Sequence, residues 1–134
     1  NLTFEEVQHY NLNTFDRRNV LSVATKLTTK RYDELPTSFD FFIKGISFED
    51  IRKTTSLIVN VGDELNNRRE NNNQYDPYAI KLFLGENELG YVPREYSRLI
   101  SVEMDINEAE YGTEVLEVNE IDEYNSILVR MSRI

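Results

Sequence analysis

The sequence predicts a mainly β fold with a few helices, in which a small all-β barrel or sandwich follows a helical appendage. From Phe39 onward, short apolar runs alternate with turn residues, which is the spacing of a small β domain. Residues 1–37 lack this alternation. With 134 residues, of which 40% are hydrophobic, the chain can form one packed core and is too short for two comfortable domains.

Residues 1–37 are expected to form one or two short helices. Thr3, followed three residues later by Glu6, has the form of a capping box that opens the first helix. A second helix is expected over Phe15–Leu27, where apolar residues recur at helical spacing. Pro36 ends this appendage, because the residue before a proline is pushed toward extended backbone.

The first part of the barrel is expected to contain five strands, separated by turn residues. Gly62–Asp63 precedes the third strand, and Gly85–Asn87 forms a hairpin connection between the last two. The run Asn71–Asn73 predicts a loop. The expected strands are Phe39–Ile46, Leu57–Val61, Glu64–Arg69, Ala79–Leu84 and Glu88–Val92.

The last third of the chain predicts a helix and then a hairpin. The helix is expected over Pro93–Ile100, with the proline in its first turn. Two alternating runs follow, Thr113–Val118 and Ser126–Met131, separated by Asp122–Asn125, a connection suited to a hairpin. We expect these strands to close or extend the sheet.

The formal net charge of −9 argues against a nonspecific nucleic-acid coat, because sequence-independent affinity comes from lysine and arginine that neutralise phosphates. The charge is unevenly distributed. Residues 1–51 carry six cations against eight anions, residues 52–98 seven against seven, and residues 99–134 two against nine. The neutral middle can therefore present a local basic face. Its cations are Arg52, Lys53, Arg68, Arg69, Lys81, Arg94 and Arg98.

The composition also excludes several classes of site. No cysteine is present, and the single His9 cannot form a multi-histidine metal cage. The apolar runs are far shorter than the roughly 20 residues that cross a bilayer, and no secretion signal marks the amino end, so a cytoplasmic setting without a membrane partner is expected. No nucleophile, base and oxyanion set can be recognised, so we expect a non-catalytic protein without a cofactor or metal.

Four blocks of the sequence are distinctive: Phe42–Glu49, Gly62–Leu65, Arg69–Leu82 and Leu89–Glu95. They contain Asn-x-Tyr-Asp-x-x-Ala-Ile and Gly-Tyr-Val-Pro-Arg-Glu. In order, spacing and residue identity, over about half of the chain, these blocks resemble the HIRAN domain family. The resemblance implies an OB- or SH3-like β-barrel, and the predicted helices of residues 1–37 would form an N-terminal helical extension to it. The barrel would span residues 38–134, with its motif core at 39–103 and a C-terminal hairpin at 113–132.

The resemblance also implies a ligand. In the amino-terminal modules of SWI/SNF-type fork-remodelling helicases, the family captures the 3′-hydroxyl end of single-stranded DNA. Carried over by position, Phe48 and Tyr75 would be platforms for the terminal base, and Asp76 would accept a hydrogen bond from the terminal hydroxyl. The positions where relatives contact the nucleotide and its phosphates would be Asn73, Tyr91 and Arg94.

The chemistry of these residues agrees with such a site. Stacking on an aromatic face contributes roughly 1–3 kcal/mol per base whatever the base is. A carboxylate beside a polyanion is repulsive unless it meets a hydroxyl donor, so Asp76 favours a strand end over an internal phosphate. Ser47 is a departure, because the end-binding relatives have an arginine there. Gly-Ile-Ser-Phe-Glu instead resembles the bacterial and phage stand-alone branch, whose ligands the resemblance does not fix.

Two classes of function remain open. The first is a non-catalytic DNA-binding module that recognises single-stranded ends or unusual DNA structures. The second is a protein-interaction or regulatory module, such as a phage-type inhibitor, that docks its acidic C-terminal region on a basic protein surface. In the purely structural alternative, Tyr75 packs at the base of the asparagine loop, Asp76 caps its own turn, and Tyr91 is a half-buried residue that packs on the core at a strand end. Arg68–Arg69 and Glu103–Glu123 would then be solvated surface.

Overall fold

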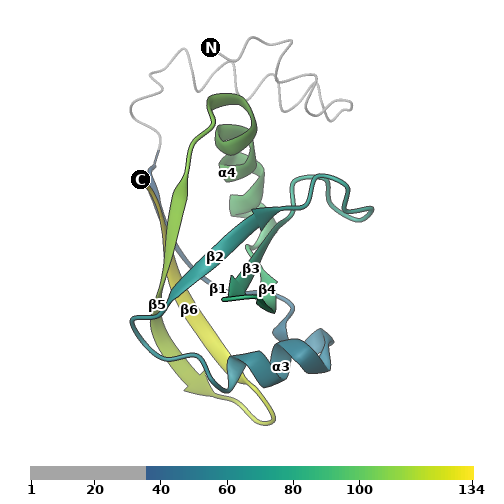
Figure 1. Ribbon diagram of the computed structural model, residues 1–134, viewed down its shortest axis with the longest axis vertical. Coiled ribbons are helices and arrows are strands. Elements are labelled where there is room, and N and C mark those ends of the chain that lie inside the picture. The colour runs from purple at the N-terminus through teal and green to yellow at the C-terminus, as the bar shows by residue number, and fades with distance from the viewer. Residues whose placement is uncertain (1–35) are drawn as a thin grey trace. The chain divides into compact units, whose positions relative to one another are not determined.

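The computed structural model describes residues 36–134. The predicted helices within residues 1–37 therefore lie outside the described residues, as does His9. The described part contains one antiparallel sheet with the strand order β1-β6-β5-β2-β3-β4 (Figure 1). Its strands are β1 (Ser38–Phe42), β2 (Glu64–Arg69), β3 (Ile80–Leu84), β4 (Asn87–Tyr91), β5 (Tyr111–Glu120) and β6 (Asn125–Arg133).

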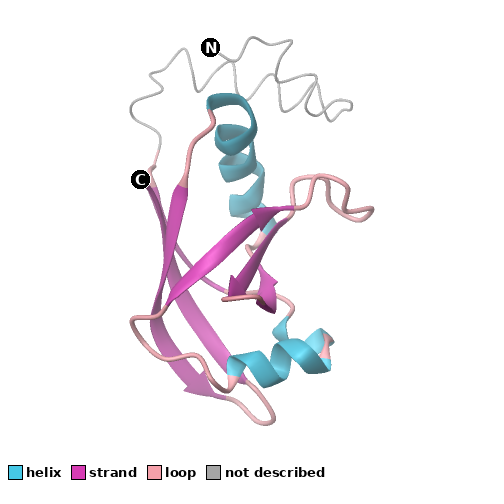
Figure 2. Ribbon diagram, viewed as in Figure 1, coloured by secondary structure: helices cyan, strands magenta, loops and turns pink. Residues whose placement is uncertain are grey.

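The sheet curls until its two outer strands meet. Lys44, just beyond β1, pairs with Tyr91 at the end of β4, and each N–H donates to the other residue's carbonyl at 2.8–2.9 Å. Gly90 permits this approach, because a Cβ atom there would lie only 2.5 Å from the Lys44 carbonyl oxygen and from Cγ2 of Ile43. The resulting fold is mainly β and OB-like, as predicted (Figure 2).

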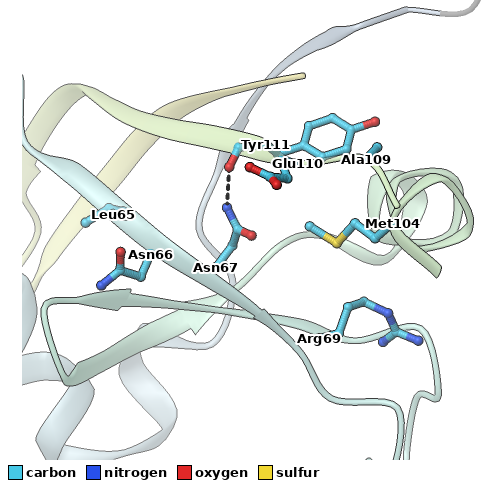
Figure 3. A pocket seen from close by; sticks show the side chains of 8 residues that line it. All are labelled: Leu65, Asn66, Asn67, Arg69, Met104, Ala109, Glu110 and Tyr111. Carbon is cyan, nitrogen blue, oxygen red and sulfur yellow. Dashed lines mark hydrogen bonds between the residues drawn. The ribbon is translucent and has the colours of Figure 1, made fainter. Parts of the chain in front are cut away.

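The curled sheet opens on one side. β2 pairs with β5 at Glu64 and Leu65, after which β2 continues beside β3 while β5 continues beside β6 (Figure 3). Asn67 spans the widening gap, since its Nδ2 donates to the Tyr111 carbonyl at 3.0 Å and to Thr113 Oγ1 at 3.4 Å. The Asn67 side chain thus connects β2 to β5 where the two strands no longer share backbone hydrogen bonds.

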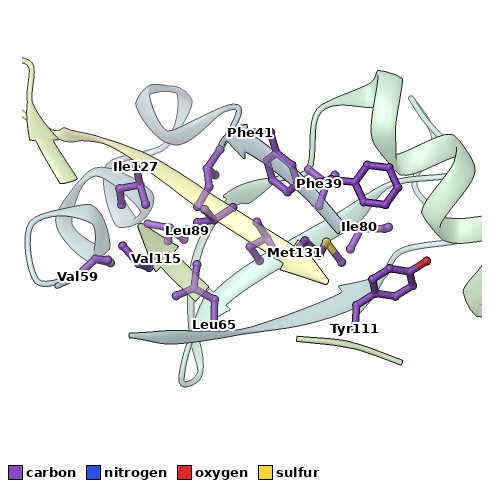
Figure 4. Close-up of a cluster of buried hydrophobic side chains, with 14 of the residues drawn as sticks. Phe39, Phe41, Val59, Leu65, Ile80, Leu89, Tyr111, Val115, Ile127 and Met131 are labelled. Carbon is purple, nitrogen blue, oxygen red and sulfur yellow. The ribbon is translucent and has the colours of Figure 1, made fainter. Parts of the chain in front are cut away.

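The core lies inside the curl (Figure 4). Alternation along β1 buries Phe39 and Phe41 while Asp40 stays exposed. The helix α4 (Arg94–Asn107) covers these rings, and the Tyr96 ring centroid lies 5.6 Å from each of them. The most deeply buried side chains are Ile80, Leu82, Leu89, Ile100, Val115, Ile127, Val129 and Met131.

Most of the predicted strands are confirmed. β2 has the predicted bounds, β3 begins one residue later than predicted, and β4 both begins and ends one residue earlier. The predicted hairpin strands Thr113–Val118 and Ser126–Met131 are both longer, as β5 and β6. The predicted strand Phe39–Ile46 stops at Phe42, because Gly45 turns the chain into a short 3-10 helix. In the described part of the chain, no helix is long and apolar enough to cross a membrane.

The predicted strand Leu57–Val61 is wrong. A helix that the sequence analysis missed, α3 (Asp50–Ser56), ends there and the chain continues through turns. The apolar run was misleading because Leu57, Ile58 and Val61 are exposed, and Val59 alone of the run is buried. The segment is held by Asn125, whose N–H donates to Ser56 Oγ at 2.9 Å and whose Nδ2 donates to the Ser56 carbonyl at 3.1 Å.

α4 also continues well past its predicted end at Ile100, to Asn107. Its last turns are anchored rather than solvated. Glu103 is buried and accepts a hydrogen bond from Nη1 of Arg133 at 2.7 Å, and Asp105 pairs with Arg69 at 2.8 Å. The expectation that the whole of Glu103–Glu123 is solvated surface is therefore wrong at its beginning.

Candidate functional site

The turn after β1 forms the first part of the candidate site. Gly45 has a φ of +81°, a conformation that glycine adopts without strain, and it begins η2 (Ile46–Phe48). A Cβ atom at Gly45 would lie 3.3 Å from Nη1 of Arg52 and 4.0 Å from the rings of Phe48 and Tyr91. Nη1 of Arg52 also donates to the Gly45 carbonyl at 3.0 Å. The glycine therefore lets two aromatic rings and a guanidinium converge.

The loop between β2 and β3 forms the second part and is ordered by its own side chains. Oδ1 of Asn73 accepts the N–H groups of Tyr75 and Asp76 at 2.8 and 3.0 Å. Oδ1 of Asp76 accepts the N–H of Tyr78 at 2.9 Å, so the expected cap of its own turn is present. Tyr75 is 82% exposed, so the alternative that it packs under the loop is wrong.

Arg94 links this loop to the start of α4. Its Nη2 donates to the Tyr75 carbonyl at 3.3 Å, and its Nε lies 3.5 Å from Oδ2 of Asp76. A cation in the first turn of a helix opposes the helix dipole, and the Asp76 carboxylate offsets that repulsion. The side chain of Arg94 is still 65% exposed, so its guanidinium can also meet an anion from solvent.

Glu70 joins the two parts of the site. Its Oε1 accepts hydrogen bonds from the Tyr91 hydroxyl at 2.7 Å and from Nδ2 of Asn73 at 3.0 Å, and its Oε2 lies 3.4 Å from Nζ of Lys81. Burial alone would raise the pKa of Glu70, but these hydrogen bonds and the Lys81 charge hold it below its ordinary value. Burial and Glu70 together raise the pKa of Tyr91, so its hydroxyl remains a donor.

Two cations and a second carboxylate surround the Tyr91 ring. Glu88 lies 3.1 Å from Nζ of Lys81 and 2.9 Å from Nε of Arg52. Both cations approach the Tyr91 ring, at 5.2 and 5.5 Å from its centroid, within cation–π range. We call Arg52, Glu70, Lys81, Glu88 and Tyr91 the Tyr91 network. Its two cations and two carboxylates leave it without net charge.

The family follows from the comparison of this chain with known proteins. The HIRAN domain model matches residues 36–131, well over half of the chain. The chain belongs to the HIRAN domain family. HIRAN domains are known as DNA-binding modules and are generally non-catalytic.

Two crystal structures share the fold of this HIRAN domain. A protein from Lactobacillus plantarum is 23% identical, with a TM-score of 0.59 over 72% of this chain and 95% of that chain. The HIRAN domain of human HLTF is 20% identical, with a TM-score of 0.56 over 72% of this chain and 74% of that chain. Among curated proteins, none matches the sequence.

All six residues that the sequence analysis proposed for the site lie along one series of contacts in this HIRAN domain. Phe48 lies at one end, beside Gly45, and Tyr91 follows. Glu70 connects Tyr91 to Asn73, which holds Tyr75 and Asp76, and Arg94 closes the series. Tyr91 is half-buried at the end of β4, as the structural alternative expects, and its ring also contacts two cations.

Sequence reasoning missed the acidic members of the network, Glu70 and Glu88. Glu70 lies within the matched motif, directly before the asparagine run, and that position was the available signal. Arg52 and Lys81 were predicted as parts of a basic face, yet each is held by a carboxylate. Within residues 36–134, no cluster of side chains is suited to hold a metal ion.

Arg69 belongs to the scaffold beneath the loop. Its guanidinium donates to both carboxylate oxygens of Asp105 and to the carbonyls of Pro77 and Ala79. It thereby fastens the end of the β2–β3 loop to α4. The expectation that Arg68–Arg69 is a solvated face is therefore wrong for Arg69.

Proposed function

We propose that this HIRAN domain binds the ends of DNA single strands and prefers a free 3′-hydroxyl. The observation that carries the proposal is the exposure of two aromatic rings at the two sides of one ordered network. Phe48 is 80% exposed and Tyr75 is 82% exposed. Each ring can stack on a base for roughly 1–3 kcal/mol without reading its identity. The backbone positions of both rings are fixed, by Gly45 and by Asn73.

The charges beside Tyr75 support a preference for a strand end. Oδ1 of Asp76 is occupied by the Tyr78 N–H, while Oδ2 faces Arg94 at the longer distance of 3.5 Å. A carboxylate oxygen has more than one acceptor direction, so Oδ2 can accept a hydrogen bond from a terminal hydroxyl. A terminal phosphate at the same place would be repelled. The exposed guanidinium of Arg94 is suited to the next phosphate along the strand.

The cation beside the departure at Ser47 is Arg52, which is already paired. This arginine reaches from α3 to the Gly45 carbonyl, two residues before Ser47, so a cation lies beside the turn. Its side chain is only 12% exposed and is held by Glu88. Because Glu88 balances its charge, Arg52 adds little positive potential near Phe48, and Arg94 supplies the direct contact to phosphate.

The experiment is fluorescence anisotropy at low salt with one short single-stranded DNA that ends in either a 3′-hydroxyl or a 3′-phosphate. We expect the hydroxyl end to bind more tightly. Tyr75→Ala should weaken binding to both ends by roughly tenfold, as the loss of one stacked base implies. Phe42→Ala is the matched control, because Phe42 is another half-exposed ring, on β1, outside the network.

Asp76→Asn tests the end preference separately. The asparagine keeps an oxygen for the Tyr78 N–H, but it replaces the free carboxylate oxygen by an amide donor. We therefore expect the preference for the hydroxyl end to disappear or to reverse while the loop stays folded. Equal affinity of the parent chain for both ends would refute end recognition. No binding at low salt would refute DNA binding altogether.

A protein-interaction module is the second candidate, and the outer side of β5 favours it. Glu114, Glu117 and Glu120 are exposed along this strand. Charge reversal at Glu117 and Glu120 should abolish binding of a basic protein and leave DNA affinity unchanged or slightly increased. Salt dependence does not separate these partners by itself, so the paired charge reversal is the deciding measurement.

A further inference from the structure

A cavity of about 410 Å³ lies outside the network, at the opening where β2 leaves β5 (Figure 3). Leu65 and Asn67 of β2 line one side, Met104 of α4 lines another, and Glu110 and Tyr111 line a third. Small-ligand pockets fall between about 300 and 1,000 Å³, so this volume suits one long side chain with its adjoining peptide groups.

The side chains of Asn67 and Glu110 each offer an acceptor to a ligand in this cavity. Nδ2 of Asn67 is occupied by the Tyr111 carbonyl and by Thr113, which leaves its Oδ1 as an acceptor on the side of Met104 (Figure 3). Glu110 is exposed at the rim, and no cation of residues 36–134 lies within ion-pair distance of its carboxylate. A ligand that satisfies both groups must donate hydrogen bonds and carry positive charge.

Arg69 lines the same cavity and does not make it basic. Its charge is balanced by Asp105 at 2.8 Å, and its guanidinium also donates to the carbonyls of Pro77 and Ala79. The remaining formal charge of the lining is the negative charge of Glu110. A phosphate would therefore be repelled, which separates this cavity from the DNA site in the chemistry of its ligand.

Part of the lining is apolar. Leu65 and Tyr111 are buried, with exposures of 4% and 7%, and Met104 on α4 places a flexible thioether across the gap from Asn67. Long cationic side chains bury their aliphatic stem against such walls and keep the charged head at a polar rim. Arginine suits this lining better than lysine, because its planar head can donate to the Glu110 carboxylate and to Oδ1 of Asn67 at once.

The neighbouring strand edge can hold the backbone of the same ligand. The Glu70 N–H donates to the Ala79 carbonyl at 2.9 Å, across the β2–β3 pair. Because peptide groups alternate sides along an antiparallel ladder, those of Asn67 and Arg69 point away from β3, toward the gap. An extended segment laid along this edge would place alternate side chains toward the cavity.

We propose that the cavity between β2, β5 and the end of α4 binds an arginine side chain of an extended segment from a partner protein. The site is separate from the proposed DNA site and does not depend on it. It would let one HIRAN domain hold a DNA end and a basic protein segment at the same time.

The test uses the full 134-residue chain and a fluorescein-labelled peptide, Gly-Thr-Val-Arg-Val-Thr-Gly, with a matched peptide that carries citrulline in place of arginine. Citrulline keeps the shape of arginine and removes its charge. We expect the citrulline peptide to bind about tenfold more weakly, equal to ~1.4 kcal/mol. Glu110→Gln should weaken the arginine peptide by a similar factor. Glu86→Gln is the control, because it changes the net charge equally from the exposed β3–β4 turn, away from the cavity and from β5.

A second variant blocks the cavity without changing charge. Ala109 is half-buried just after α4 and forms part of the wall, so Ala109→Trp should fill the space and abolish peptide binding, and the thermal unfolding midpoint of the variant checks that the fold is retained. Equal binding of the two peptides, equal weakening by Glu110→Gln and Glu86→Gln, or no binding of the arginine peptide would each overturn the proposal. Displacement of the peptide by single-stranded DNA would overturn the claim of two separate sites.

Discussion

The Tyr91 network and the ion pair Asp40–Arg130 use the same chemistry in different surroundings. In the network, the charged side chains are between 12% and 26% exposed, and each carboxylate contacts at least two partners. Asp40 and Arg130 lie opposite each other on β1 and β6 and form two hydrogen bonds of 2.8 and 2.9 Å. Their side chains are 45% and 50% exposed.

The comparison shows that short, well-aligned hydrogen bonds do not by themselves make an ion pair important for stability. Water competes with both members of the exposed pair, so either can lose its partner at little cost. In the network, removal of one carboxylate leaves several donors facing a partly dry site. We therefore expect the network to determine the stability of the site, and the exposed pair to contribute little despite its short contacts.

The largest expected effect comes from Glu70→Ala. It removes the acceptor shared by Tyr91 and Asn73 and the counter-charge of Lys81, so we expect a loss of about 2 kcal/mol of unfolding free energy, discounted for the partial exposure of the site. For a domain of this size this corresponds to a fall of roughly 10 °C in Tm. Calorimetry measures this fall in Tm, with Glu86→Ala as the control because Glu86 is an exposed glutamate in the β3–β4 turn.

Glu70→Ala can also change DNA affinity, and two effects of the substitution act in opposite directions. Removal of a negative charge should strengthen binding if Glu70 acts only through its field. Loosening of the Asn73 loop should weaken binding if Glu70 acts by positioning Tyr75. We expect weaker binding of single-stranded DNA, and tighter binding would show that the network is not needed to order the loop.

The next largest expected effect is a pH dependence of folding stability that arises from the Tyr91 network. Burial would raise the pKa values of Glu70 and Glu88, but their hydrogen bonds and neighbouring cations lower them below 4.5. A lowered carboxyl pKa stabilises the fold fully above its unfolded value, and this stabilisation is lost as the pH falls through the folded pKa. Burial, then Glu70, raises the pKa of Tyr91 above 10.0, so its contribution is complete below pH 10.0 and is lost above the raised value.

The stability difference between the parent chain and Glu70→Ala should therefore be constant from about pH 5 to 9 and shrink below pH 4. Urea unfolding at several pH values measures it from the midpoints at constant slope. A difference that persists unchanged at pH 3 would mean that packing, rather than the ionised carboxylate, accounts for the effect of the substitution.

The sequence predicted those elements whose pattern is local. β2, β3 and β4 were found because alternation and turn residues lie within each segment. α3 was missed because it is short and its anchors are distant in sequence. Arg52 bonds Glu88 across 36 positions, and Ser56 bonds Asn125 across 69. Leu57 and Ile58, which follow the helix, are exposed apolar side chains, and in the sequence they gave the apolar run expected of a buried strand.

The candidate site likewise contains a part that local sequence patterns predict and a part that depends on distant contacts. The family motifs supplied the six proposed residues, including the Asn73 and Asp76 turns, whose hydrogen bonds span only two or three positions. Glu70 could not be assigned its role from spacing, since its bond to the Tyr91 hydroxyl spans 21 positions and depends on how β2 and β4 flank β3. The network that orders the site is thus a product of the barrel, while the loop within it is encoded locally.

The smallest expected effect is that of Asp40→Asn. The Arg130 hydrogen bond lowers the pKa of Asp40, so the pair stabilises the fold above pH 3.8 and loses this contribution at lower pH. Both side chains remain in contact with water, and salt screens what attraction they have. We expect no measurable change in Tm at pH 7, in low salt or at 0.5 M salt. If Asp40→Asn lowers Tm as much as Glu70→Ala, then contact geometry rather than burial sets the importance of these charges, and the distinction between the two regions fails.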